Sequence, residues 1–373
     1  MNPTEKQSSL KSGVSESDSH PTPAVNSFNE WDPLEEVIVG ILEGAVELCW
    51  EPGVESVMPF EQLAELKAWH LEQGGQPFFE RQLVAAQREL SEFNQILKSE
   101  GVTVRLPEPI NHARSFATLD WSSPAGNSQA KPRDVLIVIG NEILEAPMSW
   151  HSRYFEFRGY RSLVREYFRK GARWTAAPKA QLTPELYNTA YQRGEEYITT
   201  EFEPVWDAAD ICRVGKDLFI QRSNVTNLSG VEWLRRHLGD TYHIHVLEFL
   251  DDRPIHIDST FVPLAPGKLM INPDRPCKNL PEMFKKAGWD ILVPPPTVHR
   301  GAVRSQKWLH LNVLMLDEKR VIVEKEEEPF ARALKDWGFQ PILCPFRNNY
   351  RFGGSFHCST VDIRRRGELK SYF

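Results

Sequence analysis

The feature that most constrains the fold of this chain is a weak internal repeat of helix, glycine, strand and proline. In its first copy, apolar residues at 79, 83, 86, 90, 93 and 97 alternate in spacings of four and three, which predicts an amphipathic helix. Gly101 follows, at a helix end where glycine adopts the left-handed conformation most cheaply. A β-rich run over 102–106 then ends at Pro107. The same order predicts four further copies, around Gly171, Gly239 (without the final proline), Gly288 and Gly338.

The spacing of these glycines limits the possible architectures. By subtraction of their positions they lie 70, 68, 49 and 50 residues apart, which leaves room for further strands between the copies. Five such units favour radial repetition, with helices outside and strands around a central axis, where polar side chains at inner strand ends converge on one pocket. A doubly wound α/β sheet has the same local order, so the repeat alone leaves both α/β folds open.

Composition narrows the class of protein. The 373 residues are 41% hydrophobic and 25% charged, as in soluble globular proteins. Apolar runs such as 135–139 are far shorter than the ~20 residues of a membrane span, so we expect no membrane partner. A net charge of -7 argues against nucleic acid as a partner. Five cysteines, an odd number, indicate reduced thiols and a cytoplasmic location.

The chain divides into a tail and one large domain. Residues 1–26 are rich in Ser, Thr and Pro without an apolar face, which predicts a disordered N-terminal tail. We expect a single domain over 27–373, with a first strand near 35–40. The motifs GxGxxG, GxSxG and HExxH, the P-loop and paired CxxC are all missing from the sequence. Nucleotide binding, serine hydrolysis and structural zinc therefore lose their usual support.

His256 and Asp258 are the first candidates for chemistry. If the segment 254–258 is a strand, residues two apart share a face, and these two side chains point the same way between buried isoleucines. An imidazole beside a carboxylate suits a site for a cationic substrate. A hydrogen-bonded structural histidine explains the same pattern and is the commoner case.

Cys358 is the second candidate. It follows Gly353 and Gly354, which allow the backbone to approach a ligand closely. A cysteine is the best nucleophile at neutral pH where a nearby cation favours its thiolate. Most free cysteines are small buried hydrophobes, which is how we interpret the other four, and only Cys358 has neighbouring glycines.

A third cluster holds Asp207 and Asp210 among Trp and Ala over 203–210. Carboxylates in such surroundings indicate buried acceptors, although an N-cap explains Asp207 equally well. The basic run 364–366 is interpreted as a solvated or ion-paired edge, because three basic residues do not make a nucleic-acid site.

Taken together, these segments resemble the amidinotransferases, the family that includes L-arginine:glycine amidinotransferase, over nearly all of 26–373. The matching blocks are NEWDPLEEVIVG, PRDVLIVIGNEILEAPM, TTEFEPVWDAAD, QRSNVTN, HIDSTF, NPDRPC, KWLHLNVLMLDEKRV and GGSFHCSTVDIRRRGELKSY. The resemblance implies the pentein fold, a five-bladed α/β propeller with pseudo-fivefold symmetry, in agreement with the five-unit repeat.

The resemblance also implies the residues of the site. The family's catalytic triad matches Cys358, His256 and Asp207. Its arginine-binding positions match Asp134, Asp258, Arg275 and Ser305. Two carboxylates suit a planar, permanently charged guanidinium. The implied reaction is ping-pong: the Cys358 thiolate takes the amidino group of L-arginine, ornithine leaves, and an acceptor amine receives the group. No metal or organic cofactor is implied.

Two departures from the glycine-using members concern the acceptor amine. Those members have Asn-Pro-Met before the catalytic histidine, where this chain has Arg253-Pro254-Ile255, and Ser-Ser-Lys-Trp where this chain has Gln306 in second place. We therefore expect a bulkier acceptor amine, as in cyanobacterial alkaloid toxin pathways of the saxitoxin type. Glycine as the acceptor, a guanidine hydrolase of the same fold and a non-enzymatic pentein are the alternatives. The sequence does not decide the oligomeric state, for which a homodimer is one option.

Overall fold

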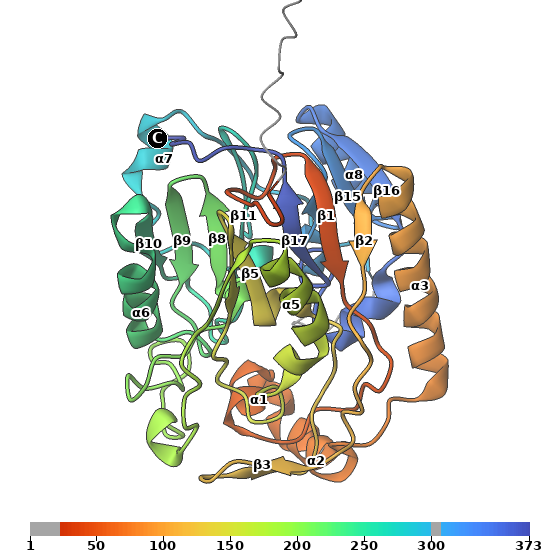
Figure 1. The fold of residues 1–373 in the computed structure, drawn as a ribbon, viewed down its shortest axis with the longest axis vertical. Helices are drawn as coiled ribbons and strands as arrows, with labels where there is room; N and C mark the ends of the chain where they lie inside the picture. Colours follow the sequence, from red (N-terminus) through yellow and green to blue (C-terminus); the bar gives the residue numbers. More distant parts are fainter. Residues whose placement is uncertain (1–22, 300–306) are drawn as a thin grey trace, which may run out of the picture.

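The computed structural model describes residues 23–299 and 307–373. Within these ranges, five three-stranded sheets share one plan (Figure 1). An inner strand pairs antiparallel with a middle strand, a helix follows, and an outer strand pairs parallel with the middle one. Five separate sheets exclude the doubly wound alternative, in which the strands share one sheet.

Four of the units are continuous in the chain, and the first is completed by the C-terminal strand. The first contains β17 (Thr360–Arg365), β1 (Leu34–Val39), α3 (Glu80–Ser99) and β2 (Thr103–Arg105). The others, each in the order inner strand, middle strand, helix and outer strand, are β5 (Leu136–Ile139), β6 (Glu142–Glu145), α5 (Arg161–Arg169), β7 (Arg173–Ala176); β8 (Ile211–Val214), β9 (Asp217–Gln221), α6 (Leu228–Leu238), β10 (His243–Leu247); β11 (Phe261–Ala265), β12 (Lys268–Ile271), α7 (Glu282–Lys286), β13 (Asp290–Leu292); and β14 (Leu314–Met315), β15 (Arg320–Glu324), α8 (Glu328–Asp336), β16 (Gln340–Cys344).

Shorter elements connect these units. Helices α1 (Pro52–Val57) and α2 (Leu63–Gln73) and the hairpin β3 (Phe116–Ala117) and β4 (Ser122–Ser123) lie together at one end of the molecule (Figure 1). In the described part of the chain, no helix combines the length and apolar character needed to cross a lipid bilayer.

Burial falls from the inner to the outer strand of each unit. Every residue of β5, β8 and β11 is buried, whereas β2, β7 and β13 have no buried residue. The inner strands are therefore enclosed by protein, and helices such as α3 and α6 lie at the outside (Figure 1).

The glycines of the predicted repeat are confirmed at all five positions. Each comes after the helix of its unit, and their φ angles range from +62° at Gly239 to +98° at Gly171. At Gly171 an added Cβ would meet no atom within 4 Å, so the backbone conformation alone requires glycine there. The apolar face predicted for α3 is buried at Ala86, Leu90, Phe93 and Leu97.

The last residues of the segment predicted as a tail contact the domain. Val25 is 1% exposed within a core cluster, and the Asn26 backbone N–H donates to the Ile363 carbonyl at 2.9 Å. A single valine among prolines gives no periodic pattern from which its burial could be predicted. Val25 packs in a cluster with residues of β17, which lies far away in the sequence. Pro23 is the first described residue.

A short turn precedes each inner strand, and these five turns meet. They are α4 (Pro132–Val135), η4 (Ala208–Asp210), η6 (Ile257–Ser259), η8 (Leu309–Leu311) and residues 355–359. Contacts run from α4 to η4, from η4 to η6 and from η6 to η8. After η8, Asn312 Oδ1 accepts the Cys358 N–H at 3.0 Å, and the Cys358 carbonyl accepts the Arg133 N–H at 3.4 Å. Polar residues on these turns are thereby brought together from all five units.

Buried charges behind the turns link several units. Asp362 of β17 is 0% exposed and pairs with Arg133 at 2.6 Å, Arg213 at 2.7 Å and Arg365 at 2.8 Å. These three guanidinium groups are themselves fully buried. Burial opposes the charge on Asp362, but the three arginines hold its pKa well below the usual value. The ion-paired interpretation of the basic run 364–366 is confirmed, since Arg364 and Arg365 both pair with carboxylates, but Arg365 does so in the interior and not at an edge.

We expect Asp362→Asn to lower the free energy of unfolding by about 3 kcal/mol or more, because three buried guanidinium groups lose their shared counter-ion. Urea unfolding followed by circular dichroism measures this loss. Glu232→Gln is the matched control, since Glu232 also pairs with two arginines but lies exposed on α6, and its change is expected to leave stability nearly as it was. Equal stabilities for the two variants would contradict the prediction.

Candidate active site

Cys358 lies in the turn before β17 with little exposure to solvent. Its side chain is 3% exposed, and its Sγ lies 3.1 Å from Asp258 Oδ2, to which the thiol donates. Gly354 passes so close that an added Cβ would lie 2.7 Å from this sulfur. Any side chain at Gly354 would therefore collide with Cys358.

His256 lies beside two carboxylates, although the local structure differs from the prediction. The segment is not a strand: His256 is the residue before the 3-10 helix η6 and has a φ of +49°. Pro254 has no N–H for a strand ladder, which favours the irregular backbone. His256 Nε2 lies 3.1 Å from Asp207 Oδ2, and Nδ1 lies 3.6 Å from Asp134 Oδ1. A strained non-glycine conformation is typical of functional positions.

Asp207 is a buried acceptor, not a helix cap. Although it precedes η4, its side chain makes no capping hydrogen bond. Its Oδ2 accepts from Trp150 Nε1 at 2.9 Å and from His256, so it fixes the orientation of the imidazole. Asp210 is also 0% exposed and accepts from the hydroxyls of Ser223 and Thr226. Burial raises the pKa of Asp210 to about 7, against the opposing effect of His256.

The two further carboxylates predicted for the site are present in it. Asp134 of α4 is 1% exposed; its Oδ2 accepts from Arg153 at 2.8 Å, while its Oδ1 has no hydrogen-bond partner. Asp258 is 6% exposed and contacts both Cys358 and His357. A buried acceptor atom without a donor is costly, and it is the atom that a guanidinium would satisfy.

The charges of these groups follow from their surroundings. Burial disfavours the charge on His256, but Asp134, Asp207 and Asp210 together raise its pKa to about 10. Burial, Asp258 and Asp134 hold the pKa of the Cys358 thiol well above its usual value. Without substrate, the site therefore contains a protonated His256 imidazole and a protonated Cys358 thiol.

Arg275 lies in a neighbouring pocket and has no contact with the triad. Its Nε is 3.0 Å from Asp251 Oδ2, and its Nη1 donates to Thr260 Oγ1 at 3.4 Å. The pocket has a volume of about 190 Å³ and is lined by Asp251, Arg253, Ser259, Asp274, Arg275, Trp308 and Leu309. Ser259, which lines this pocket, directly follows Asp258 in the chain, whereas Asp258 and Asp134 are not among the lining residues. Ser305 and Gln306 lie outside the described residues.

The structure adds two polar residues that our sequence analysis did not single out. Asn312 Oδ1 accepts the N–H groups of Ser355 and Cys358, and its Nδ2 donates to the Asp258 carbonyl at 3.2 Å. Lys131 Nζ donates to the Gly354 carbonyl and to Ser359 Oγ. Burial lowers the pKa of Lys131 to about 8, against the effect of Cys358 and its neighbouring carboxylates. In the sequence, each of these two residues lies a few positions before an apolar strand, and this pattern could have identified them.

A search of the described ranges for three or more His, Cys, Asp or Glu side chains arranged to hold a metal ion finds none.

Several known proteins that are similar over most of this chain are named as amidinotransferases. An L-arginine:L-lysine amidinotransferase of Pseudomonas savastanoi pv. phaseolicola is 49% identical over 359 residues, which cover 94% of this chain and 97% of the relative. A mitochondrial glycine amidinotransferase of Danio rerio is 46% identical over 94% of this chain and 85% of its own length. The solved structure of SxtG, an amidinotransferase of Microseira wollei in saxitoxin biosynthesis, superposes with a TM-score of 0.90 at 50% identity, covering 94% and 100%.

More distant solved structures bear on the fold alone. An arginine dihydrolase from cyanobacteria superposes with a TM-score of 0.59 at 14% identity, and a DDAH from Pseudomonas aeruginosa with 0.56 at 12% identity, which is consistent with the pentein fold. No family model matches the chain.

The geometry predicts how the thiol responds to loss of its neighbouring charge. In Asp258→Asn, we expect Cys358 to be alkylated by iodoacetamide several-fold faster at neutral pH, because an anion that raises the thiol pKa is gone. Mass spectrometry of the Cys358 peptide measures the rate. Asp217→Asn, which removes a buried carboxylate of β9 paired with His245, is the control and should leave the rate unchanged. A slower rate in Asp258→Asn would contradict the electrostatic account.

Proposed function

The chain belongs to the amidinotransferase family, and we propose that it transfers the amidino group of L-arginine to an acceptor amine with release of L-ornithine. The observation that carries this proposal is the position of Cys358 Sγ, which shares one buried cluster with the His256–Asp207 pair and with two carboxylates.

Asp134 and Asp258 hold the guanidinium. Asp134 Oδ1 lacks a donor, and Asp258 Oδ2 lies 3.1 Å from the sulfur, so a planar cation between them satisfies both and places its central carbon at Cys358. The arriving positive charge also offsets the two anions that raise the thiol pKa. Binding of arginine thereby favours the thiolate that is needed for attack.

In the first step, arginine binding releases the Cys358 thiol proton to solvent, the thiolate sulfur forms a bond to the guanidinium carbon, and the bond from that carbon to the δ-nitrogen of arginine breaks. His256 starts protonated and gives its proton to the departing nitrogen, so that ornithine leaves as an amine. Asp207 keeps the imidazole oriented through its 3.1 Å contact. The amidino group remains on the sulfur as a covalent intermediate.

In the second step, the now neutral His256 takes a proton from the acceptor amine. The amine nitrogen attacks the amidino carbon, the carbon–sulfur bond breaks, and the Cys358 thiolate is restored. Each half-reaction returns His256 to the protonation state that the other requires, so one residue serves as acid and then as base.

Arg275 and Ser305 bind the amino-acid end of arginine in this proposal. Arg275 lines the pocket of about 190 Å³ next to Asp258, where its guanidinium can pair with an α-carboxylate. Arg253 lines the same pocket, so the pocket contains two cationic side chains.

The finer architecture and cell location also belong to the proposal. The contacts among the five turns support an arrangement of the five units about one axis, as a five-bladed propeller that forms one catalytic domain over 27–373. The enzyme works in the cytoplasm on two small molecules, L-arginine and an amine.

The acceptor is proposed to be larger than glycine, as in an alkaloid toxin pathway. Arg253 and Ile255 replace the Asn and Met of the glycine-using pattern, and the relatives at 49% and 50% identity are named for lysine and for saxitoxin biosynthesis. The pocket lining balances two arginines, Arg253 and Arg275, with two aspartates, Asp251 and Asp274, which suits an acceptor that carries both an amine and an anionic group.

The covalent step is tested by incubating the protein with arginine and no acceptor. We expect a stable mass increase of one amidino group on the Cys358 peptide, with one equivalent of ornithine released. Cys358→Ser is expected to lose both signals. Citrulline and ammonia in place of ornithine would identify a guanidine hydrolase and contradict amidino transfer.

The acceptor is tested by supplying glycine, lysine and longer amines to the charged enzyme. We expect the longer amines to discharge the intermediate faster than glycine does, and Arg253→Asn with Ile255→Met to move the preference toward glycine. Rapid formation of guanidinoacetate by the unmodified chain would contradict the larger acceptor.

A further inference from the structure

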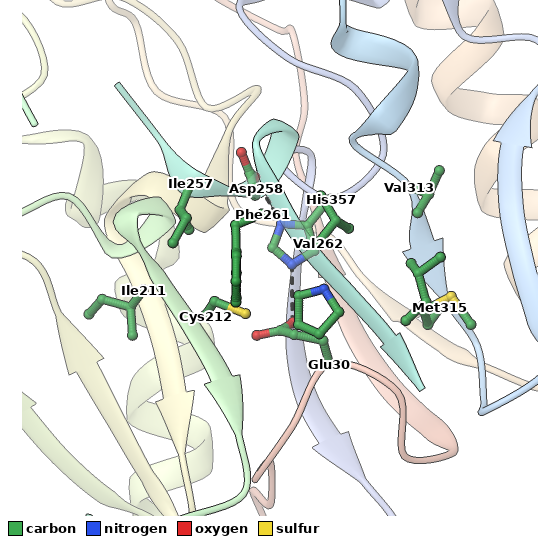
Figure 2. Close-up of a pocket in the computed structure, with 12 residues that line it drawn as sticks. Glu30, Ile211, Cys212, Ile257, Asp258, Phe261, Val262, Val313, Met315 and His357 are labelled. Atoms are coloured by element: carbon green, nitrogen blue, oxygen red, sulfur yellow. Dashed lines mark hydrogen bonds and ion pairs between the residues drawn. The ribbon is translucent and has the colours of Figure 1, made fainter. Parts of the chain in front are cut away.

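His357, directly before Cys358, has no role in the steps above, although it occupies the centre of a buried chain of charges. Its Nδ1 lies 2.8 Å from Asp258 Oδ2, and its Nε2 lies 3.1 Å from Glu30 Oε2. Figure 2 shows the ring between the two carboxylates. Asp258 Oδ2 is the same oxygen that contacts Cys358 Sγ, so the chain runs from sulfur to carboxylate, imidazole and Glu30.

The surroundings of this chain are largely apolar. A cavity of about 20 Å³ lies beside it, room for about one water molecule. Its apolar lining is formed by side chains from β8, η6, β11 and β14: Ile211, Ile257, Phe261, Val262, Leu264 and Met315. Fixed charges interact more strongly in such surroundings than in water. Whether His357 is protonated therefore directly affects the ionisation of Asp258.

The two contacts of the His357 ring indicate its protonation state. A neutral imidazole has one N–H, whereas each ring nitrogen here faces a carboxylate oxygen, so both contacts become hydrogen bonds only in the imidazolium. Burial and Arg133 oppose the charge, but Asp258 and Glu30 outweigh them and raise the pKa of His357.

Other charges also face this chain. Arg213 pairs with Glu30 at 2.8 Å from β8, and Asp362 of β17 lies close enough to affect His357 electrostatically. His256 and Lys131 face Asp258 from the side of the site. Burial opposes ionisation of Asp258, and hydrogen bonding and charge from His357 are the largest effects that bring its pKa down to about 2.

We propose that His357 is a positioning residue for amidino transfer, held as an imidazolium between Glu30 and Asp258 so that the Asp258 carboxylate stays ionised and directed at Cys358 Sγ. This inference rests on the proposed function, because it assigns the control of the carboxylate that receives the guanidinium. Glu30, on the segment before β1, is the fixed counter-ion that holds the ring in place.

The test compares His357→Asn with the wild type over a range from about pH 6 to about pH 9. Asparagine keeps one donor but carries no charge, so the pKa of Asp258 rises and part of the population is protonated at the lower pH. We expect kcat/KM for arginine to fall at least tenfold near the lower limit and to recover as pH rises, with KM changed more than kcat. Glu30→Gln should give a smaller shift in the same direction.

His245→Asn is the matched control, since His245 also pairs with a buried aspartate, Asp217, but on an outer strand. Its pH profile should equal that of the wild type. A loss in His357→Asn that is the same at every pH, or an unchanged profile, would overturn the proposal, because a purely structural role has no reason to follow the ionisation of Asp258.

A second measurement does not depend on the reaction. In protein with ¹⁵N-labelled histidine, NMR should show an imidazolium that persists above neutral pH and disappears in His357→Asn. A neutral His357 at neutral pH would overturn the proposal. If the wild type releases no ornithine from arginine, the amidino-transfer proposal fails, while this resonance still decides whether His357 is held as a cation.

Discussion

The pairing of Asp362 with three interior arginines is the interaction on which the rest of the structure depends. Arg133 belongs to α4, Arg213 to β8 and Arg365 to β17, so one carboxylate joins three units by charge. Arg365 also donates to the Met315 carbonyl of β14. Arg213 continues to Glu30, from which the chain of contacts reaches the active-site turn. Removing one partner of such a buried set leaves an uncompensated charge, so the units that carry these residues must stay in place for the charges to remain paired.

Neutralisation at the centre also sets the chemistry of the site. The turns before the inner strands carry an excess of carboxylates, which face His256 and Lys131 on one side and His357 on the other. Such an excess of carboxylates disfavours an anion and favours a planar cation such as a guanidinium. In the proposed reaction the turns hold the guanidinium of the donor, whereas Arg253 and Arg275 line the neighbouring pocket. The relatives are named for different amines, lysine in one and glycine in another.

Local features of the fold could be predicted from the sequence, and distant pairings could not. The helix of the first copy and the glycines after all five helices depend on residues within one turn of each other, and they were predicted correctly. The strand predicted around His256 was wrong because alternation in five residues cannot reveal a positive φ. Val25 and Arg365 are buried against segments from the opposite end of the chain: Asn26, next to Val25, donates to the Ile363 carbonyl, and Arg365 donates to the Asp32 carbonyl. The convergence of Cys358, His256 and Asp207 came from the family resemblance, since no spacing in the sequence relates them.

The completion of the first unit by β17 has a consequence for biosynthesis. Cys358 and β17 are translated after the four other units and after β1, α3 and β2 of the first unit. Until then the nascent chain has the carboxylates of the site but not the sulfur to which the proposed reaction assigns the attack, and β1 has no inner neighbour. The proposed nucleophile and the strand that completes the first unit are therefore added together, so a chain that stops before Cys358 would have neither.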